Sequence, residues 1–407
     1  MKSGMRKNMK RINGKFIFLF LGGCGVVQPL NAMNKVITAA LLRDREIIKG
    51  IKVLPQEIKL HIISLVLHGV RGYTFSLFKT LDVQSTVTSV AWSPYRKVLL
   101  IGTSDRKSSL WDAATGEMLR TFQGEDDEAG SVAFSPDGET VLTGNGDGSL
   151  CLWNTHTGEL ITTFRGHTSR ISSLVYSPNG ESILSGADDR TVRLWSLKTE
   201  NMLKTFKKHK KCITSVAWSS DGTSILIGDL THKVRIRSLT TGKLVKKLTG
   251  HIDRITSVAY SPDGETILTG SEDTTARLWC AKTGKLLRTF KGHSDCVTSV
   301  AYSPDGETIL TGCEDATARL WSLKTGNTLK VMKEHNDCVS AVAFSSDGAS
   351  FVTGSHDDTV CIWKFMHGFE SLTEEQKRMC FEQFMSYYCA LITAKDGAEQ
   401  APAGSSE

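Results

Sequence analysis

The sequence predicts an all-β fold in which similar units of four strands form a closed ring. Tryptophan recurs with a constant step of 42 residues, and arginine takes the one missing place in the series. The series comprises Trp111, Trp153, Trp195, Arg237, Trp279, Trp321 and Trp363. Within each copy, short segments of β-forming residues alternate with turn residues. Four short strands in each of seven successive copies are typical of a radial β-propeller.

Turn signals divide each copy into its four strands. In the fifth copy, Pro262 presets the φ angle of a tight turn and Gly264 tolerates a positive φ, so the chain reverses between the first two strands. The predicted strands of this copy are Ile255–Tyr260, Thr266–Thr269, Thr275–Trp279 and Leu286–Phe290. The segments Thr256–Trp279 and Thr298–Trp321 differ at only two positions, so we expect adjacent copies to share one structure.

The two ends of the repeat region predict how the ring closes. The last copy ends after its third strand, at Ile362-Trp363, and lacks a fourth. Upstream of the first copy, Phe75–Leu81 resembles the fourth strand Leu286–Phe290 of the fifth copy. Pairing of the two ends would close the ring and hide its edge strands. We therefore predict a propeller over residues 73–365 that is closed by an N-terminal strand.

The repeated residues also resemble a known family. Gly250-His251, Ser261–Gly264, Asp273 and Leu278-Trp279 match the motif of the WD-repeat family in order and spacing, although only Trp111-Asp112 is literally Trp-Asp. The resemblance covers residues 73–365. It implies a seven-bladed propeller that acts as a protein-interaction scaffold and binds partners on its narrow top face.

One set of four polar and aromatic residues recurs in four copies. In the WD-repeat family such a set is a buried hydrogen-bond network that runs from Asp through His and Ser/Thr to Trp. Its members here are His167, Ser185, Asp189 and Trp195; His251, Thr269, Asp273 and Trp279; His293, Thr311, Asp315 and Trp321; and His335, Thr353, Asp357 and Trp363. Ser, His and Asp are also the residue types of a hydrolase triad. Four equivalent active sites in one ring would be odd chemistry, so we interpret the sets as structural and predict no enzyme. The fourth copy keeps His209 but carries Ile227, Thr231 and Arg237 at the other three positions, so we expect blade 4 to be the least stable.

Carried over from the family, two turn positions in each copy point to the binding face. The candidate partner-binding residues are Arg170, Asp188, Arg254, Glu272, Glu314 and His356. A face that mixes both charges suits a peptide with both charges or a protein surface. The alternative is that these are ordinary solvated turn residues.

Charge and cysteine usage narrow the ligand classes. Residues 73–370 carry 33 Lys and Arg against 34 Asp and Glu, and this neutral balance lacks the basic footprint of nucleic-acid binding. No Cys-x-x-Cys pair signals zinc. We expect a monomeric propeller that binds a protein or peptide, with no cofactor, no metal and no small-molecule substrate.

The N-terminal segment 1–32 has the form of a secretory signal. Six Lys and Arg precede the apolar run Phe16–Val27, and Cys24 lies in a loose lipoprotein-like box. This pattern predicts export or membrane association. The unpaired cysteines favour a reducing compartment instead, so a cytoplasmic location is the alternative.

Residues 33–70 are predicted to be helical and flank the ring. Part of this segment resembles the opening of an F-box, the helical motif that docks substrate receptors onto a ubiquitin-ligase adaptor. The matching residues are Leu54, Pro55, Glu57, Ile58 and Ile62, within residues 53–67. The alternative function is therefore a ubiquitin-ligase substrate receptor, which the export-like segment would make an exported bacterial effector. A helix that merely packs on the ring is the simpler interpretation.

The C-terminal segment is predicted to add one more helix. Ser371–Glu374 forms a capping box, and an apolar stripe follows it to Ile392. This pattern predicts a helix over residues 371–392. Residues 395–407 have the composition of a disordered tail.

Overall fold

The computed structural model describes residues 75–105, 107–123, 129–207 and 209–365. The predicted signal-like segment 1–32, the F-box-like segment 33–70, the helix 371–392 and the tail 395–407 lie outside the described residues. The described part of the chain is all β-structure, and it contains no helix that is long and apolar enough to cross a membrane.

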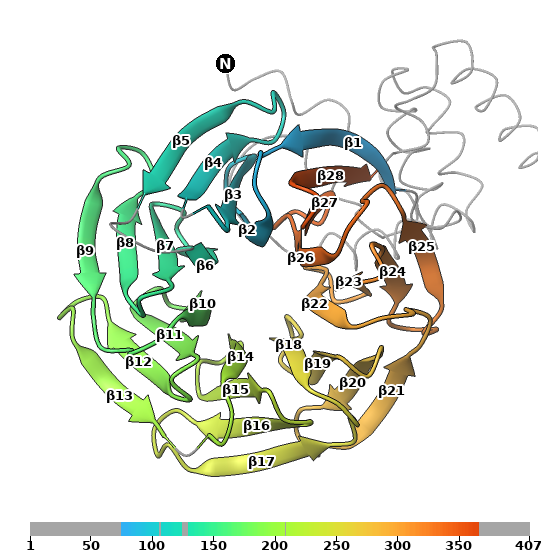
Figure 1. Cartoon of the computed structure of the whole chain (residues 1–407). Coiled ribbons are helices and arrows are strands. Elements are labelled where there is room, and N and C mark those ends of the chain that lie inside the picture. The colour runs from blue at the N-terminus through green and yellow to red at the C-terminus, as the bar shows by residue number, and fades with distance from the viewer. Residues whose placement is uncertain (1–74, 106, 124–128, 208, 366–407) are drawn as a thin grey trace, which may run out of the picture.

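Seven four-stranded antiparallel sheets, or blades, are arranged in a ring (Figure 1). Blade 1 comprises β2 (Val87–Trp92), β3 (Val98–Thr103), β4 (Lys107–Asp112) and β5 (Met118–Gln123). Blade 2 comprises β6 (Ala129–Phe134), β7 (Thr140–Asn145), β8 (Leu150–Asn154) and β9 (Leu160–Phe164). Blade 3 comprises β10 (Ile171–Tyr176), β11 (Ser182–Ala187), β12 (Val192–Ser196) and β13 (Met202–Phe206). Blades 4 and 5 comprise β14 (Ile213–Trp218), β15 (Ser224–Asp229), β16 (Lys233–Ser238) and β17 (Leu244–Thr249); and β18 (Ile255–Tyr260), β19 (Thr266–Ser271), β20 (Ala276–Cys280) and β21 (Leu286–Phe290). Blades 6 and 7 comprise β22 (Val297–Tyr302), β23 (Thr308–Cys313), β24 (Ala318–Ser322) and β25 (Thr328–Met332); and β26 (Val339–Phe344), β27 (Ser350–Ser355), β28 (Thr359–Phe365) and β1 (Phe75–Asp82).

The hydrophobic core lies between successive blades. The second strand of each blade is buried almost throughout, because both of its faces meet a neighbouring blade. The fourth strand has an exposed outer edge. Trp279 of blade 5 shows the packing, because it contacts a cluster that contains Leu226 and Leu248 of blade 4. Each third-strand Trp in such a cluster therefore fills the gap to the preceding blade.

The predicted closure of the ring is confirmed. β1 pairs antiparallel with β28, with Phe75 opposite Phe365 and Leu81 opposite Val360. The Phe75 ring lies 4.8 Å from the ring of Phe351, and Leu81 is 3% exposed. The first strand of the domain thus completes the sheet of the last blade.

Among the hydrogen bonds that join successive blades, two sets recur around most of the ring. In six inner strands a Ser hydroxyl oxygen accepts the backbone N–H of the next inner strand, at 3.1–3.3 Å; the acceptors are Ser89, Ser131, Ser173, Ser215, Ser257 and Ser299. Blade 7 has Ala341 at this position. At that junction Ser340 Oγ donates to the Val87 carbonyl at 2.6 Å, as Ser172 Oγ donates to the Ile213 carbonyl at 2.6 Å between blades 3 and 4.

A basic side chain in the middle of most fourth strands forms the second set, which the sequence analysis missed. Arg120 donates to the Thr157 carbonyl at 2.5 Å, Lys204 to Leu239 at 2.8 Å and Arg288 to Thr325 at 2.6 Å. Lys246 and Lys330 make the equivalent bonds to Lys282 and Phe75. Lys79 of β1 donates to Ala114 of blade 1 at 3.1 Å, across the closing junction. We call these cations clasps, because each holds its blade to the next.

Deleting residues 75–82 should leave β28 with an unpaired edge and destabilise the propeller, since this also removes the Lys79 clasp. Moving the same eight residues to follow Phe365 through a two-residue Asn-Gly turn should restore stability, because Phe75 and Phe365 already lie opposite each other and a hairpin needs turn residues between its paired ends. Thermal unfolding followed by circular dichroism would compare the two proteins with the parent. A deletion variant that unfolds at the parental temperature would contradict the closure role.

Candidate functional site

The turns of the blades gather on two faces of the ring. We call the upper face the one that carries the turns between second and third strands and the loops that join blades. The lower face carries the Ser-Pro-Asp-Gly and Lys-Thr-Gly turns. The four predicted polar networks lie beneath the upper face.

Blade 5 shows the geometry of one network. The carboxylate of Asp273 lies 2.7 Å from Nδ1 of His251, and Nε2 of His251 lies 2.7 Å from Oγ1 of Thr269. The Trp279 indole N–H donates to the same Thr269 oxygen at 2.9 Å. Blades 3, 6 and 7 bring their four predicted residues together in the same order. Each network therefore ties the entry loop, the second strand, the turn and the third strand of its blade together.

Burial sets the protonation of the networks in blades 3, 5 and 6. Burial lowers the pKa of His251, and the hydrogen bond with Asp273 offsets only part of that effect. Burial would raise the pKa of Asp273, but hydrogen bonds from His251 and Thr275 outweigh it and hold this pKa well below its usual range. Blades 3 and 6 show the same directions. At neutral pH a neutral imidazole thus lies beside an ionised carboxylate.

The hydroxyl groups of the networks cannot act as nucleophiles on a bound substrate. Ser185, Thr269, Thr311 and Thr353 are all fully buried. Each hydroxyl is enclosed by a His and a Trp side chain, so a substrate has no access to it. The arrangement fits a structural role, in which every buried polar group finds a partner.

Blade 4 replaces the network with a different one. The sequence series left Thr231 at the Asp position, but the acid is supplied by Asp229, two residues earlier. Asp229 is fully buried, lies 3.3 Å from Nδ1 of His209, and accepts hydrogen bonds from Thr231 and Arg235. With Ile227 in place of the hydroxyl residue, Nε2 of His209 has no hydrogen-bond partner within the described part of the chain.

Arg237 occupies the Trp position of blade 4. Its guanidinium donates to the Gly242 carbonyl at 3.0 Å and to the Lys207 carbonyl at 3.4 Å. Its Nε is buried without a partner among the described residues. Burial and the nearby Arg235 both lower the pKa of Arg237. In blade 4, a partly solvated cation therefore lies in the gap to blade 3, where other blades place the apolar ring of a Trp side chain.

The six candidate partner-binding residues lie on the upper face. One backbone hydrogen bond recurs there, from the turn residue to the carbonyl of the loop residue before the first strand. It joins Asp188 to Arg170 at 3.0 Å, Glu272 to Arg254 at 2.9 Å, Glu314 to Cys296 at 2.9 Å and His356 to Cys338 at 2.9 Å. The two predicted positions of each blade are thus adjacent.

Opposite charges meet at two of these positions. Nη1 of Arg254 lies 3.7 Å from a carboxylate oxygen of Glu272, and the Arg254 side chain is 57% exposed. Burial raises the pKa of Asp188, and the Arg170 cation offsets part of that rise. A half-exposed ion pair such as Arg254–Glu272 contributes little to stability. Its exposed groups remain accessible to a partner.

Among the described residues, two groups of side chains are close enough to hold a metal ion. One comprises His293, Cys313 and Asp315; the other comprises Asp295, Cys296 and Glu314. In the first group, His293 and Asp315 already bond to each other in the blade 6 network. In the second, burial and the Glu314 carboxylate raise the pKa of Cys296 to about 12, so this thiol is protonated at neutral pH. We assign no metal centre to either group.

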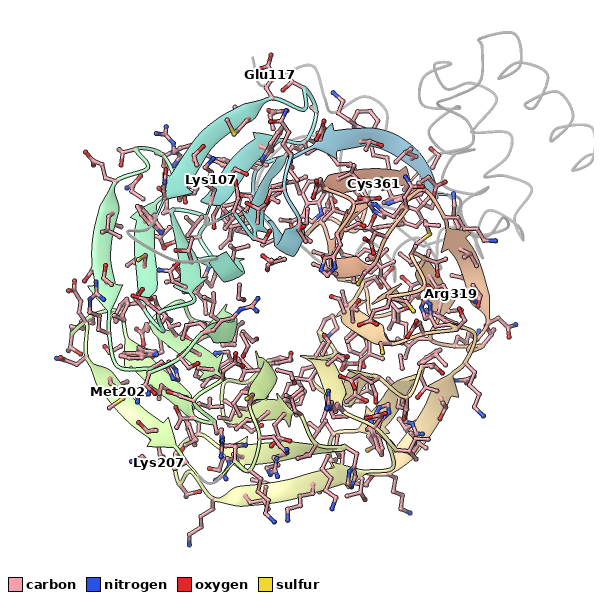
Figure 2. All side chains as sticks on the ribbon, viewed as in Figure 1. Lys107, Glu117, Met202, Lys207, Arg319 and Cys361 are labelled. Carbon is pink, nitrogen blue, oxygen red and sulfur yellow. The ribbon has the colours of Figure 1, made fainter. Side chains whose placement is uncertain are left out.

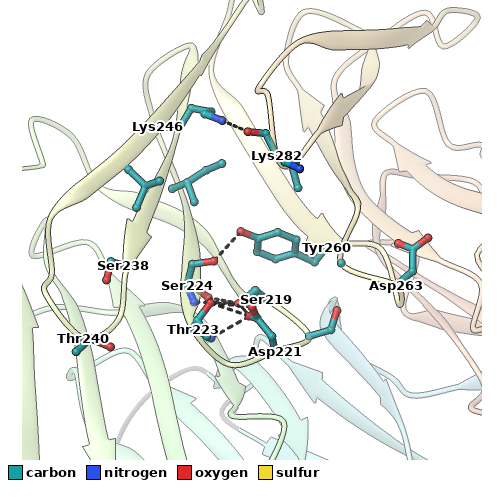
Figure 3. A pocket seen from close by; sticks show the side chains of 15 residues that line it. Ser219, Asp221, Thr223, Ser224, Ser238, Thr240, Lys246, Tyr260, Asp263 and Lys282 are labelled. Carbon is teal, nitrogen blue, oxygen red and sulfur yellow. Dashed lines mark hydrogen bonds between the residues drawn. The ribbon is translucent and has the colours of Figure 1, made fainter.

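A cavity of about 680 Å³ opens on the lower side between blades 4 and 5 (Figure 3). Ala281, which lines it, stands where blades 4 and 6 carry Leu239 and Leu323. Its polar groups bond to one another: the hydroxyls of Ser224 and Tyr260 lie 3.2 Å apart (Figure 3). These contacts leave no convergent acid–base pair among the described residues that line it, and we interpret the cavity as a packing gap.

Substituting Thr269→Val should destabilise the protein by about 1–3 kcal/mol, because it leaves Nε2 of His251 and the indole N–H of Trp279 buried without a partner. Thr269→Ser is the matched control, since Ser185 holds this position in blade 3. Chemical denaturation would measure both variants. Equal stability of Thr269→Val and the parent would show that the network contributes nothing.

Blade 4 should exchange its backbone amides faster than blade 5, because its network lacks the hydroxyl and the Trp. Hydrogen–deuterium exchange with mass spectrometry would compare peptides that cover β16 with those that cover β20. Blade 3, which has a complete network, serves as a second reference. Equal protection of β16 and β20 would contradict the prediction.

Comparison with known families agrees with this architecture. Residues 86–242 match the family model described as IFT122 first beta-propeller, and residues 242–280, 284–322 and 326–364 match the model described as WD domain, G-beta repeat. No curated protein matches the chain significantly. Propellers of this type are generally non-catalytic and generally bind proteins. The chain therefore contains WD repeats and forms a seven-bladed β-propeller.

Proposed function

We propose that the protein is a non-enzymatic interaction scaffold that binds a peptide or protein on its upper face. The contacts are made by Arg170, Asp188, Arg254, Glu272, Glu314 and His356. The partner segment carries both charges, with acidic groups for the two arginines and basic groups for the carboxylates.

The observation that carries this proposal is the adjacency of the two predicted positions. The backbone bonds between Arg170 and Asp188 and between Arg254 and Glu272 place a cation beside an acid in blades 3 and 5. In blade 6 the acid Glu314 is exposed and lies beside a thiol instead. The face therefore presents a fixed order of charges around the ring, which a complementary partner could recognise.

Rigidity supports the same function. The inter-blade serines, the clasps and the buried networks fix the backbone on which these side chains stand. A preorganised surface loses little conformational entropy when a partner binds. A rigid ring with a varied rim is therefore suited to recognition.

The receptor function stays a second proposal, supported by the sequence of residues 53–67. In this form, Leu54, Pro55, Glu57, Ile58 and Ile62 dock a ubiquitin-ligase adaptor while the upper face selects the substrate. Export through residues 1–32 would make such a protein an effector. Substituting Leu54→Asp and Ile58→Asp tests the docking step alone, because it leaves the upper face intact.

Affinity purification with quantitative mass spectrometry would test the upper face. The double variant Arg170→Glu/Arg254→Glu should lose specific partners at least about ten-fold relative to the parent, because it places like charges beside Asp188 and Glu272. Lys198→Glu/Lys324→Glu changes the net charge equally on the lower face and should retain them. The proposed face would be refuted if both variants lost the same partners, or if neither variant lost any.

A further inference from the structure

Blade 4 carries an excess of positive charge, although the propeller as a whole is close to neutral. Residues 207–247, which run from the entry loop of blade 4 into its fourth strand, contain ten Lys and Arg but only two acids, Asp221 and Asp229. Asp229 is fully buried and already bonded to His209, Thr231 and Arg235. Asp221 lies in the turn between β14 and β15, on the lower face. The upper end of blade 4 therefore has cations without an exposed acid.

Five lysines gather at this end, and we call them the blade-4 basic corner: Lys207, Lys210, Lys211, Lys233 and Lys247. The loop that carries the first three is held to the blade by the contact of His209 with Asp229 and by the bond from Arg237 to the Lys207 carbonyl. Lys247 lies opposite Arg235 in the pairing of β16 with β17, and Lys233 lies opposite Thr249. Figure 2 shows Lys207 in the outer part of the ring.

The other blades show that the fold does not require these lysines. At the position of Lys211, blades 5, 6 and 7 carry Asp253, Asp295 and Asp337. At the position of Lys247, blades 3 and 5 carry Thr205 and Thr289. These Thr and Asp residues occupy the same strand and loop geometry. The charge at these two positions is thus particular to blade 4 and has no structural role common to the blades, whereas the position of Lys207 is also basic at the entry to blades 3, 6 and 7, as Arg165, Lys291 and Lys333.

The lysines of the corner are available to a ligand. Lys207, Lys210, Lys211 and Lys247 are exposed, and none of the five corner lysines forms an ion pair with a described residue. By contrast, the cation Arg165 at the start of blade 3 lies 3.5 Å from Asp147. The half-buried guanidinium of Arg237 beneath the corner adds positive charge that no described carboxylate neutralises. Clustered cations without counter-charges repel one another, and an anionic ligand would relieve this repulsion.

We propose that the blade-4 basic corner binds an acidic segment of a partner protein, at a site separate from Arg170 and Arg254. The size of the corner favours a short segment, because Asp253, at the equivalent position in blade 5, would repel a long polyanion. The large aromatic residues exposed in the described part of the chain are Phe78 and Tyr95, in blades 7 and 1, so the corner lacks the stacking platform typical of single-stranded nucleic-acid binding.

A fluorescein-labelled peptide of ten glutamates is the probe, and fluorescence anisotropy with the full chain measures its binding. The test variant is Lys210→Ser/Lys211→Asp/Lys247→Thr, whose new residues stand at the same positions in other blades as Ser294, Asp295 and Thr289. This variant should fold and should weaken binding at least about ten-fold, since it removes three cations and adds an acid. Binding to the parent should also weaken as salt rises.

The control Lys243→Glu/Lys285→Glu lowers the net charge by the same amount on the lower face and should bind within about two-fold of the parent, since these charges lie far from the corner. Arg170→Glu/Arg254→Glu should also keep peptide binding, which separates this site from the proposed upper-face site. The proposal is wrong if the parent shows no saturable binding at low salt, or if the corner variant and the control bind equally. It is also wrong if a ten-nucleotide single-stranded RNA binds the corner more tightly than the peptide, because the corner would then be a nucleic-acid site.

Discussion

The pairing of β1 with β28 is the interaction on which the rest of the ring depends. Each blade buries its second strand only because a neighbour lies on both sides, and this condition holds for all seven blades only in a closed circle. The contacts of Phe75 with Phe351 and of Leu81 in the blade 7–blade 1 core fix that closure. The clasps and inter-blade serines then repeat the same joint around the ring. Loss of the contacts between two blades therefore also destabilises blades that take no part in those contacts.

Much of the fold could be predicted from the sequence because the structure repeats. A period of 42 residues placed every blade, and the missing fourth strand of the last copy pointed to β1. The strands of blade 5 begin and end within two residues of the prediction. Periodicity fails where one copy departs from the rest. Asp229 was missed because the acid of blade 4 moved by two residues, and spacing alone cannot signal such a shift.

The clasps and the basic corner were missed for a different reason. From sequence alone, a lysine or arginine in the middle of an outer strand is expected to be solvated. Only the packing of the next blade beside that strand brings a backbone carbonyl within hydrogen-bond distance of the cation. The charge of blade 4 disappeared when it was averaged over a neutral domain. The residues between blades are thus constrained by packing that every blade shares, whereas the residues at the rim differ from one blade to the next.

Ring closure by the first strand also constrains how the protein is made. A ribosome synthesises β1 before any other part of the propeller and β28 last, so β1 must wait for nearly the whole domain. At typical rates of synthesis this delay is on the order of tens of seconds. During that time the apolar side chain of Phe75 has no native partner, because its cluster belongs to blades 6 and 7, and Leu81 can contact only blade 1. Lys79 provides the only charge within the strand before its terminal Asp82. The nascent propeller is therefore most prone to aggregation at β1. This risk ends only when the last strand, β28, has been synthesised and can pair with β1.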